Sequence, residues 1–419
     1  MNPLLDRKFF VPDAEARVMP DGRLYIYGSL DTLGNPNYCS REYRVFSCGN
    51  ENLEDWTDHG VSFSNHADNP GIPWLPDKAL YAPDAVYANG KYYLYACGPR
   101  RFEITAESDT PWGPFINASP IHIADGDGID PAVFVDDDGC AYYFWGQFHL
   151  KGARMNPDMR GIDPATLKTA ILTEQEHGFH EGGSIRKRNG KYYMVYTDIS
   201  RGKATCLSYA VSDSPLGPYQ KRGVIIDNFY CDPSTWNNHG SIENFRGRWF
   251  VFYHRSTQNS VSSRRVCAEP IFFNADGTIN EVEMTVNGAS PPIDAYQGLD
   301  ASLACRMKGN LYIKTVMCDG EAAETLVNCG GGNWTQDWAE YKYLNFSTGA
   351  ASCRIDIRGK GKVTLMTEGW ITCGVCEIGC EDFHGYTFPV SGLAGVKPIW
   401  FLFDGREIEF KRLVFTPAP

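Results

Sequence analysis

Hydrophobic and polar residues alternate along most of this chain, and the alternating stretches recur after a glycine. Five stretches start at Gly and continue with aromatic and aliphatic residues: 22–28, 90–96, 139–146, 190–196 and 247–253. Two of the glycines follow Asn, at Asn89-Gly90 and Asn189-Gly190, and Asn-Gly is a strong hairpin signal. The period of two predicts short strands, so each stretch is predicted to lie in an antiparallel sheet.

The repeating unit is about fifty residues long, which indicates a repeat architecture. A shorter strand-like run precedes several of the glycine turns, at 85–88, 132–135 and 183–186. The segment 108–115 recurs as 212–219, and both are Pro/Gly turns between outer strands. Helical periodicity is nearly absent. We therefore predict an all-β fold whose first domain, residues 1–295, is a five-bladed β-propeller.

The repeat ends after residues 266–273, and the segment 287–293 is predicted to be a linker. Strand-like runs then return without the repeat, at 311–314, 339–343, 362–365, 399–403 and 407–410. Spaced short strands over this length predict a β-sandwich, jelly-roll-like, for residues 296–419.

Charge and composition narrow the choice of ligand. The formal net charge of −12 argues against nucleic acid or an anionic membrane as partner and fits a neutral ligand such as a sugar. Aromatic residues make up 13% of the chain, and amphipathic rings suit sugar-binding walls. The first residues lack the apolar segment of a signal peptide, so a cytoplasmic location with 14 reduced cysteines is expected. A secreted form whose signal has been removed is the alternative.

A polar residue stands in register just before the first strand of every predicted blade: Asp13, Asp84, Asp130, Glu181 and His239. The first strands of a propeller line its channel, so these positions are expected to meet at one mouth. Carboxyl groups gathered there repel one another, which separates their pKa values into acid and base roles. Cleavage of a glycoside with inversion needs such a pair, spaced roughly 6.5–9.5 Å apart.

Five motifs in this order resemble glycoside hydrolase family 43 over about residues 5–295: Pro12–Val18, Ala82–Asp84, Ile129–Pro131, Glu181–Ile185 and His239–Ile242. The resemblance implies that Asp13 is the general base and Glu181 the general acid. It also implies that Asp130 holds the acid in place and keeps it protonated by like-charge repulsion. The family's first motif commonly reads Asp-Pro, whereas Asp13 is followed here by Ala14. The family pattern therefore does not predict the backbone conformation around the expected base.

Further site residues follow from the same resemblance. No cofactor is required for the chemistry, but a Ca²⁺ or another cation near the channel centre is an option, with His239 beside it. An arginine of the last blade is expected to contact substrate; Arg265 is the candidate and Arg264 its neighbour. Asp84 is expected to contact substrate, with a role in lining the wall or bonding a neighbouring blade as its structural alternative. Sugar rings are expected to stack on Trp145, with Trp74 and Tyr81 as further candidates. A turn, ion-pair or core role is the structural alternative for each of these side chains.

The C-terminal region resembles carbohydrate-binding module family 6 through residues 337–342, 359–363 and 399–405. That resemblance implies sugar contacts by Trp334 and Trp370, while a structural role in bracing the catalytic pocket is the favoured alternative. The cysteines at 373, 376 and 380 lack a second Cys-x-x-Cys pair, so we predict that they do not bind zinc.

The predicted function is removal of terminal α-L-arabinofuranosyl or β-D-xylosyl units from oligosaccharides derived from arabinoxylan, arabinan or xylan. An endo-acting arabinanase or xylanase and a non-catalytic sugar-binding propeller are the alternatives. A retaining fructan-type hydrolase is a further one, but the Asn-Asp-Pro context expected for its nucleophile is missing at Asp13.

Overall fold

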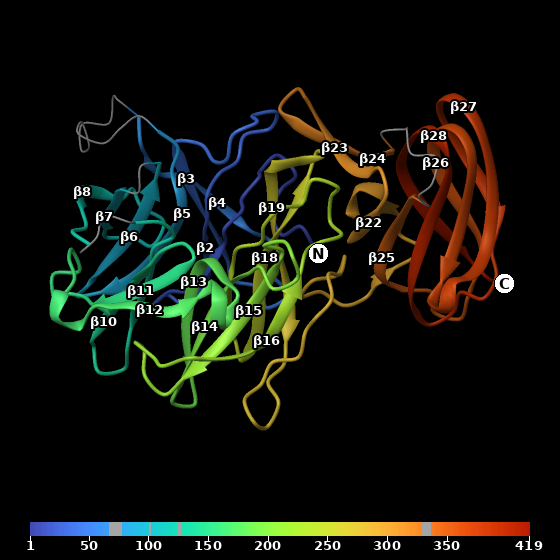
Figure 1. Cartoon of the computed structure of the whole chain (residues 1–419). Coiled ribbons are helices and arrows are strands. Elements are labelled where there is room, and N and C mark those ends of the chain that lie inside the picture. The colour runs from blue at the N-terminus through green and yellow to red at the C-terminus, as the bar shows by residue number, and fades with distance from the viewer. Residues whose placement is uncertain (67–77, 100–101, 124–127, 329–336) are drawn as a thin grey trace.

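The computed structural model describes residues 1–66, 78–99, 102–123, 128–328 and 337–419 (Figure 1). Almost all regular structure in these residues is β, with five separate antiparallel sheets before a sixth, larger sheet. The predicted all-β fold, a five-bladed propeller followed by a second β domain, is confirmed. None of the helices in the described ranges has the length and apolar character needed to cross a membrane.

Each blade is a consecutive antiparallel sheet. Blade one contains β1 (Glu15–Val18), β2 (Leu24–Tyr27), β3 (Glu42–Cys48) and β4 (Thr57–Ser64). Blade two contains β5 (Tyr81–Ala88), β6 (Lys91–Gly98), β7 (Phe102–Ser108) and β8 (Ile116–Pro120). Blade three contains β9 (Ala132–Val135), β10 (Ala141–Trp145), β11 (His149–Arg154) and β12 (Lys168–Thr173). Blade four contains β13 (Phe179–Arg188), β14 (Lys191–Asp198), β15 (Cys206–Ser212) and β16 (Gln220–Asp227). Blade five contains β17 (Ser241–Phe245), β18 (Arg248–Thr257) and β19 (Ser260–Ile271). The turns η1 (Pro164–Thr166) and α1 (Glu174–His177) lie before β12 and β13.

The glycine turns seen in the sequence join the first two strands of the blades. Asn89 and Gly90 have φ values of 51° and 79°, and Asn189 and Gly190 have values of 49° and 73°. Positive φ at both central residues is the geometry of a type I′ turn, whose twist matches that of the flanking strands. The Asn-Gly pairs therefore set the register of their blades.

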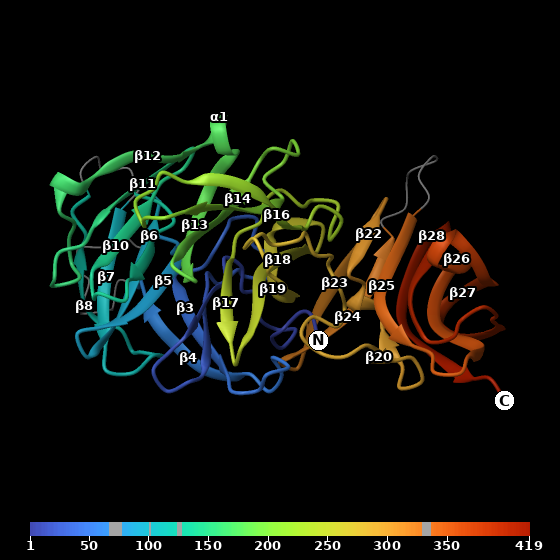
Figure 2. The ribbon, with the colours of Figure 1, turned by 90° about the horizontal axis from the view of Figure 1, so that it is seen from below.

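The N-terminal segment closes the ring of blades. The Asn2 side chain donates to the Ala268 carbonyl at 3.0 Å and accepts from the Ala268 amide at 2.9 Å. A parallel bridge also joins Ala14 to Gly240, just before the first strands of blades one and five. The ring is thus fastened at the point where its ends meet. In Figures 1 and 2 the N-terminus lies between the propeller and the C-terminal domain.

The C-terminal domain is built from one sheet that folds over itself. Its shorter elements are β20 (Ile293–Asp294), β21 (Leu299–Asp300), η2 (Ala301–Leu303), β22 (Arg306–Lys308), β23 (Leu311–Cys318), β24 (Glu321–Asn328) and β25 (Asp337–Asn345). Its long strands are β26 (Ala350–Thr367), β27 (Ile371–Pro389) and β28 (Val396–Pro417), with η3 (Glu368–Trp370) between the first two. Two strands were predicted within 399–410, but β28 runs through both. Gly405 permits this, because a Cβ there would lie 2.4 Å from the Lys360 carbonyl oxygen.

The predicted linker packs against the C-terminal domain instead of spanning a gap. Val286, just before it, donates its amide to the Lys342 carbonyl at 2.6 Å, and β20 begins at Ile293 inside it. A single hydrophobic cluster runs from blade four, with Val195 and Ile226, to Phe401 in β28. The two domains therefore share a core, which fixes one relative to the other.

Candidate functional site

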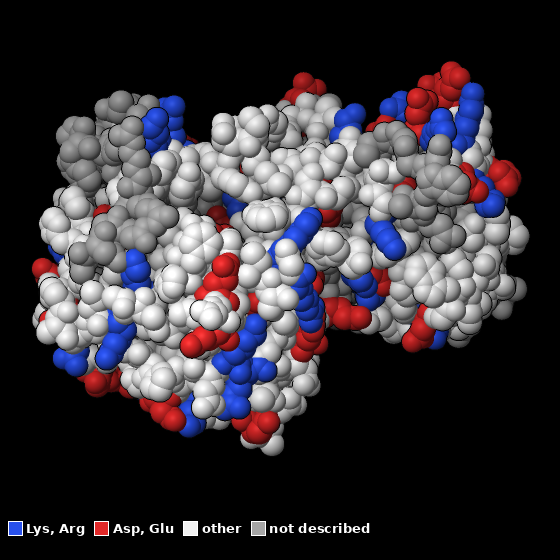
Figure 3. Space-filling view, in the orientation of Figure 1, with Lys and Arg blue, Asp and Glu red and all other residues white. Residues whose placement is uncertain are grey.

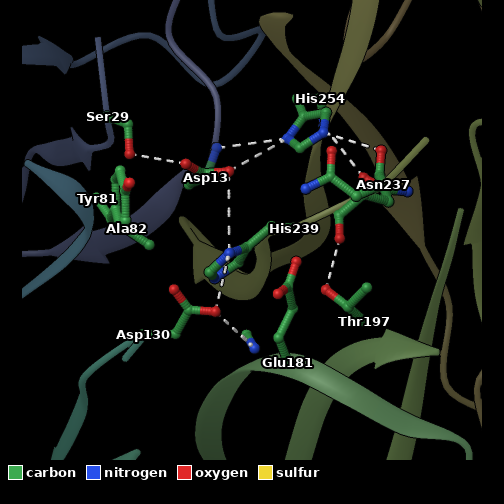
Figure 4. Close-up of polar contacts among 12 residues, drawn as sticks. Asp13, Ser29, Tyr81, Ala82, Asp130, Glu181, Thr197, Asn237, His239 and His254 are labelled. Carbon is green, nitrogen blue, oxygen red and sulfur yellow. Dashed lines mark hydrogen bonds and ion pairs between the residues drawn. The ribbon is translucent and has the colours of Figure 1, made fainter. Parts of the chain in front are cut away.

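Four side chains from four blades meet at one mouth of the channel, as the register predicts. Asp13, Asp130 and His239 stand two residues before β1, β9 and β17, and Glu181 lies near the start of β13. Figure 4 shows His239 between Asp13 and Asp130, with the Glu181 carboxyl group facing the same space. Asp13 and Asp130 have φ values of 56° and 55°, a left-handed conformation that Asp tolerates better than most residues.

The Asp13 carboxylate is buried among donors and positive charge. Ser29 Oγ donates to its Oδ2 at 2.7 Å, and Arg264 Nη1 donates to its Oδ1 at 3.0 Å. Burial alone would raise the pKa of Asp13, but Arg264, then His239, outweighs it and holds this pKa below its ordinary value. Asp13 is therefore ionised at neutral pH, as a general base requires.

His254 supports Asp13 as a neutral ring. Burial and the nearby Arg264 lower the pKa of His254 to about 3. Its Nδ1 accepts from the Asp13 amide at 3.5 Å, and its Nε2 lies 3.0 Å from the Asn237 carbonyl, so the proton belongs on Nε2. The ring thus fixes the backbone of Asp13 and adds no charge to the site.

Asp130 has the opposite electrostatic character to Asp13. Burial raises the pKa of Asp130 to about 7; His239 opposes the rise, and repulsion from Glu181 and Asp13 adds to it. Its Oδ2 accepts the Gly182 amide at 3.1 Å, which ties it to the residue after Glu181. Glu181 is less buried and accepts from Gln147 Nε2 at 2.9 Å. Burial therefore favours the protonated form of Asp130 in the free site.

His239 lies at the centre of the group. Its Nδ1 is 3.9 Å from Asp13 Oδ1 and 4.0 Å from Asp130 Oδ2, so one imidazole faces both carboxyl groups. Gly182 packs on the other side, where a Cβ would lie 2.9 Å from the ring. This glycine has φ of 66°, so both its conformation and the close ring exclude a side chain.

The prediction that Asp84 contacts substrate is wrong, because its carboxylate is bound by protein donors inside the channel. Arg17 donates to it twice, at 3.0 and 2.6 Å, and the Val133 amide donates at 2.7 Å. Arg186 lies beside this pair and binds Glu15 at 2.7 Å and Glu243 at 2.9 Å. Asp84 thus joins blades through an ion network and has the structural role that was its alternative.

Arg264, and not Arg265, is the arginine at the mouth. Arg264 reaches Asp13, binds both oxygens of Asp31 at 2.9 and 3.0 Å, and lies over the Tyr38 ring at 4.7 Å. Arg265 points the other way and pairs with Glu324 of the C-terminal domain. Neighbouring residues of a strand face opposite sides, so a choice between them depends on a register that the sequence does not give.

The prediction that a sugar ring stacks on Trp145 is also wrong. Its side chain is fully buried and packs against Tyr143 in the core between blades two and three, so it cannot contact a sugar. Trp74, named with it, lies outside the described residues.

Sequence reasoning missed the second ring of residues around the mouth. Ser29 and Asp31 follow β2, Gln147 follows β10, and His254 lies in β18. All lie in or just after the second strand of a blade, which runs antiparallel to the first and so ends at the mouth where the first begins. The residues after each repeated aromatic run were thus the available signal.

Comparisons with known proteins agree with this geometry. The family model described as glycosyl hydrolases family 43 matches residues 4–279. The xylosidase/arabinosidase of Thermoclostridium stercorarium is 32% identical over 351 residues, which are 73% of this chain and 72% of that protein. Xylosidase/arabinosidase 43A of Humicola insolens is 34% identical over 67% of this chain and 98% of its own.

Among solved structures, a β-xylosidase/α-arabinofuranosidase from a compost metagenome has a TM-score of 0.58 at 31% identity. That match covers 68% of this chain and 97% of the other. An arabinoxylan arabinofuranohydrolase from Bacillus subtilis has the same TM-score at 23% identity and covers 100% of this chain and 97% of its own. This second likeness extends over both domains and concerns the fold alone.

Proposed function

Because the chain belongs to glycosyl hydrolases family 43, we propose that it is an exo-acting, inverting glycoside hydrolase of pentose-containing glycans. It removes terminal α-L-arabinofuranosyl or β-D-xylosyl units from oligosaccharides derived from arabinoxylan, arabinan or xylan. The names of two relatives, both xylosidase/arabinosidases, support this substrate class. The observation that carries the proposal is the meeting of carboxyl groups from three blades, two of which have pKa values shifted in opposite directions.

The two shifts suggest how the roles divide. Asp13, kept ionised by Arg264, takes a proton from the water that attacks the anomeric carbon. Glu181 gives a proton to the leaving oxygen on the opposite face of the sugar. Asp130 is tied to the Gly182 amide beside Glu181, so it both orients the acid and supplies the charge repulsion that keeps one proton on the pair.

A cation at the channel centre fits the residues poorly. Within the described ranges no three His, Cys, Asp or Glu side chains gather as metal ligands. Positive charge inside the channel is supplied by Arg17 and Arg186, which face Glu15, Asp84 and Glu243. Thermal unfolding with and without a chelator tests this, with an unchanged Tm expected; a large fall in Tm would contradict it.

We further propose that the C-terminal domain is of the carbohydrate-binding module family 6 type and that it braces the catalytic pocket. The turn between β18 and β19 reaches it: the Gln258 amide donates to the Ile313 carbonyl at 2.9 Å, and its side chain donates to Thr315 at 2.6 Å. The same hairpin carries Arg264 back to Asp13 and Arg265 to Glu324. A displaced C-terminal domain would therefore disturb the base.

The test compares hydrolysis of aryl α-L-arabinofuranosides and aryl β-D-xylosides by the wild type, Glu181→Gln and Asp13→Asn. An acid is needed only when the leaving group is basic. The loss in Glu181→Gln should thus shrink with a dinitrophenyl leaving group, while the loss in Asp13→Asn should not. Asp109→Asn, at an exposed carboxylate paired with Lys91, is the matched control.

The anomeric form of the first product completes the test. Inversion is expected, and retention observed by NMR at early times would refute the assigned mechanism. Equal loss in the two variants with every leaving group would refute the division of roles. A folded wild type that turns over neither substrate would refute the exo-acting activity.

A further inference from the structure

The turn between β10 and β11 lies directly beside the carboxyl groups of the mouth. It consists of Gly146, Gln147 and Phe148, and we call these three residues the acid turn. The Gln147 side chain reaches the mouth, where its Nε2 donates to Glu181 Oε2 at 2.9 Å. Gln147 therefore touches the proposed general acid, so an amide at this position can affect how that acid delivers its proton.

Backbone hydrogen bonds fasten the acid turn on both sides. Its first amide donates to the Ile129 carbonyl at 2.9 Å, and Ile129 directly precedes Asp130. Its last amide donates to the His180 carbonyl at 2.7 Å, and His180 directly precedes Glu181. Together with the hydrogen bond from the Gly182 amide to Asp130, the acid turn thus fixes the two carboxyl groups relative to each other.

The conformation of the acid turn holds Gln147 toward the mouth. Gly146 has φ of 123° and Phe148 has φ of 65°, so both neighbours of Gln147 have positive φ. Positive φ is rare for a bulky residue such as phenylalanine and persists only where the surrounding structure imposes it. The Phe148 carbonyl accepts from the Glu174 amide at 2.9 Å, and its ring packs edge-to-face on the His180 ring, with centroids 5.2 Å apart. These contacts keep the turn, and with it the Gln147 amide, in one position.

An amide donor at this position can decide which oxygen of Glu181 carries the proton. A protonated carboxyl group has one O–H donor and one carbonyl-type oxygen, and the carbonyl-type oxygen is the better acceptor. Because Gln147 donates to Oε2, the proton is favoured on Oε1. After the proton has been delivered, the same N–H stabilises the carboxylate that remains, since a hydrogen bond to an ionised acceptor is stronger than one to a neutral acceptor.

We propose that Gln147 is a positioning residue that places the proton of Glu181 on Oε1 and stabilises the carboxylate left after proton transfer. In that transfer the bond between Oε1 and hydrogen breaks, and its electron pair stays on Glu181. The hydrogen bonds to the leaving oxygen, which also takes the electron pair of its broken bond to the anomeric carbon. This inference rests on the proposed function, which makes Glu181 the general acid.

The effect of Gln147 can be measured in the pH profile of activity. The titratable and charged groups around the mouth come from several blades and stay unchanged in a Gln147 variant: Asp13, Tyr38, Asp130, His180, His239 and Arg264. Among the described residues on the face seen in Figure 3, basic and acidic side chains are interspersed with large uncharged areas. Contacts close to Glu181 are therefore expected to outweigh distant surface charges, which salt screens.

Gln147→Met tests the proposal, because methionine has nearly the same length and cannot donate a hydrogen bond. kcat and KM are measured with phenyl and dinitrophenyl glycosides of the pentose that the wild type prefers. The loss in kcat should be about 10- to 30-fold with the phenyl leaving group and at most about 2-fold with dinitrophenol, which leaves without a proton, while KM stays nearly unchanged. The basic limb of the pH profile of kcat/KM for the phenyl glycoside should move to higher pH, because the anionic form of the acid loses a donor.

Gln220→Met is the matched control. Gln220 is exposed in β16, the outer strand of blade four, so this variant should match the wild type in every measurement. Thermal unfolding of both variants establishes that each is folded.

Two outcomes for Gln147→Met overturn the inference. Wild-type kinetics would show that the amide has no effect on the acid. Equal losses with both leaving groups and an unmoved basic limb would show that Gln147 supports only the local fold. If Glu181→Gln also shows no dependence on the leaving group, the proposed acid is wrong and the inference fails with it; dependence in Glu181→Gln alone refutes the inference and leaves the proposed function standing.

Discussion

Removing the carboxylate of Glu324 should loosen the contact between the domains and lower activity at the distant Asp13. Glu324 and Arg265 form an ion pair whose side chains are each only 2% exposed. Thr315 also donates to Glu324 Oε1 at 2.9 Å, and Arg7 Nε lies 3.7 Å from Oε2. Glu324→Gln keeps the shape of this centre but leaves the Arg265 cation without a buried anion.

The contacts of this ion pair predict different losses in the free energy of unfolding for three variants. In Glu324→Gln, Arg265 keeps its hydrogen bonds to the Arg7 carbonyl at 2.5 Å and the Thr315 hydroxyl at 3.2 Å but loses its carboxylate partner, and breaking such a buried pair costs about 3–5 kcal/mol. In Arg265→Met, Glu324 still has Arg7 and Thr315 as partners, so the cost should be nearer about 1–3 kcal/mol. The double variant Arg265→Met/Glu324→Leu buries no unpaired charge and should lie close to the wild type.

Thermal unfolding and aryl glycoside kinetics measure these effects together. A loss of this size lowers Tm by on the order of 10 °C in Glu324→Gln. Because Arg264 and Arg265 are consecutive in β19, kcat/KM should fall about 10-fold at a temperature where the variant is still folded. The reasoning is refuted if Glu324→Gln matches the wild type in both measurements, or if the double variant is as unstable as Glu324→Gln.

Three further changes probe the mouth itself. Arg264→Lys weakens the cation that holds the pKa of Asp13 down, so the acidic limb of the pH profile of kcat/KM should move to higher pH; an unmoved limb contradicts this role. The pKa of Asp130, about 7, lies above its ordinary 3.8, so the stability that its protonated form contributes is lost as the pH rises through 7. The Tm of Asp130→Asn minus that of the wild type should therefore increase as the pH rises from 4 to 8, while the variant loses activity. A difference in Tm that does not change with pH would contradict this. Gly182→Ala places a Cβ against His239 and should lower both kcat, by about 10-fold or more, and Tm; wild-type values would show that the ring can move freely.

The propeller could be predicted because one local pattern repeats. Each glycine turn sets a hairpin, and the period-two runs beside it give the strands, so the register of every blade follows from nearby residues. The same register predicts that Asp13, Asp130, Glu181 and His239 meet at one mouth, and it does so without information about their contacts. Topology alone was sufficient for this part of the site.

The remaining site residues depend on which way each side chain points. Asp84 lies inside β5 and pairs with Tyr95 as Glu15 pairs with Tyr27, so it stands further along its strand than Asp13 does, and Arg17 of the neighbouring blade neutralises it inside the channel. Trp145 belongs to a repeated aromatic run, and its ring fills the space between two blades. Packing between blades decides both outcomes, and a pattern within one blade contains no information about its neighbour.

The adjacent arginines of β19 link the C-terminal domain to the carboxyl groups at the mouth of the propeller. Successive side chains of a strand point to opposite faces, so Arg264 and Arg265 must face different partners. Arg264 faces Asp13 and keeps it ionised, while Arg265 faces Glu324 and anchors the strand. Since both charges are buried, neither can shift without leaving an anion unpaired, and the cost of that shift resists movement of the strand. The position of Asp13, the proposed base, is thus set partly by a carboxylate of the C-terminal domain, and in this way the domain would brace the pocket as proposed.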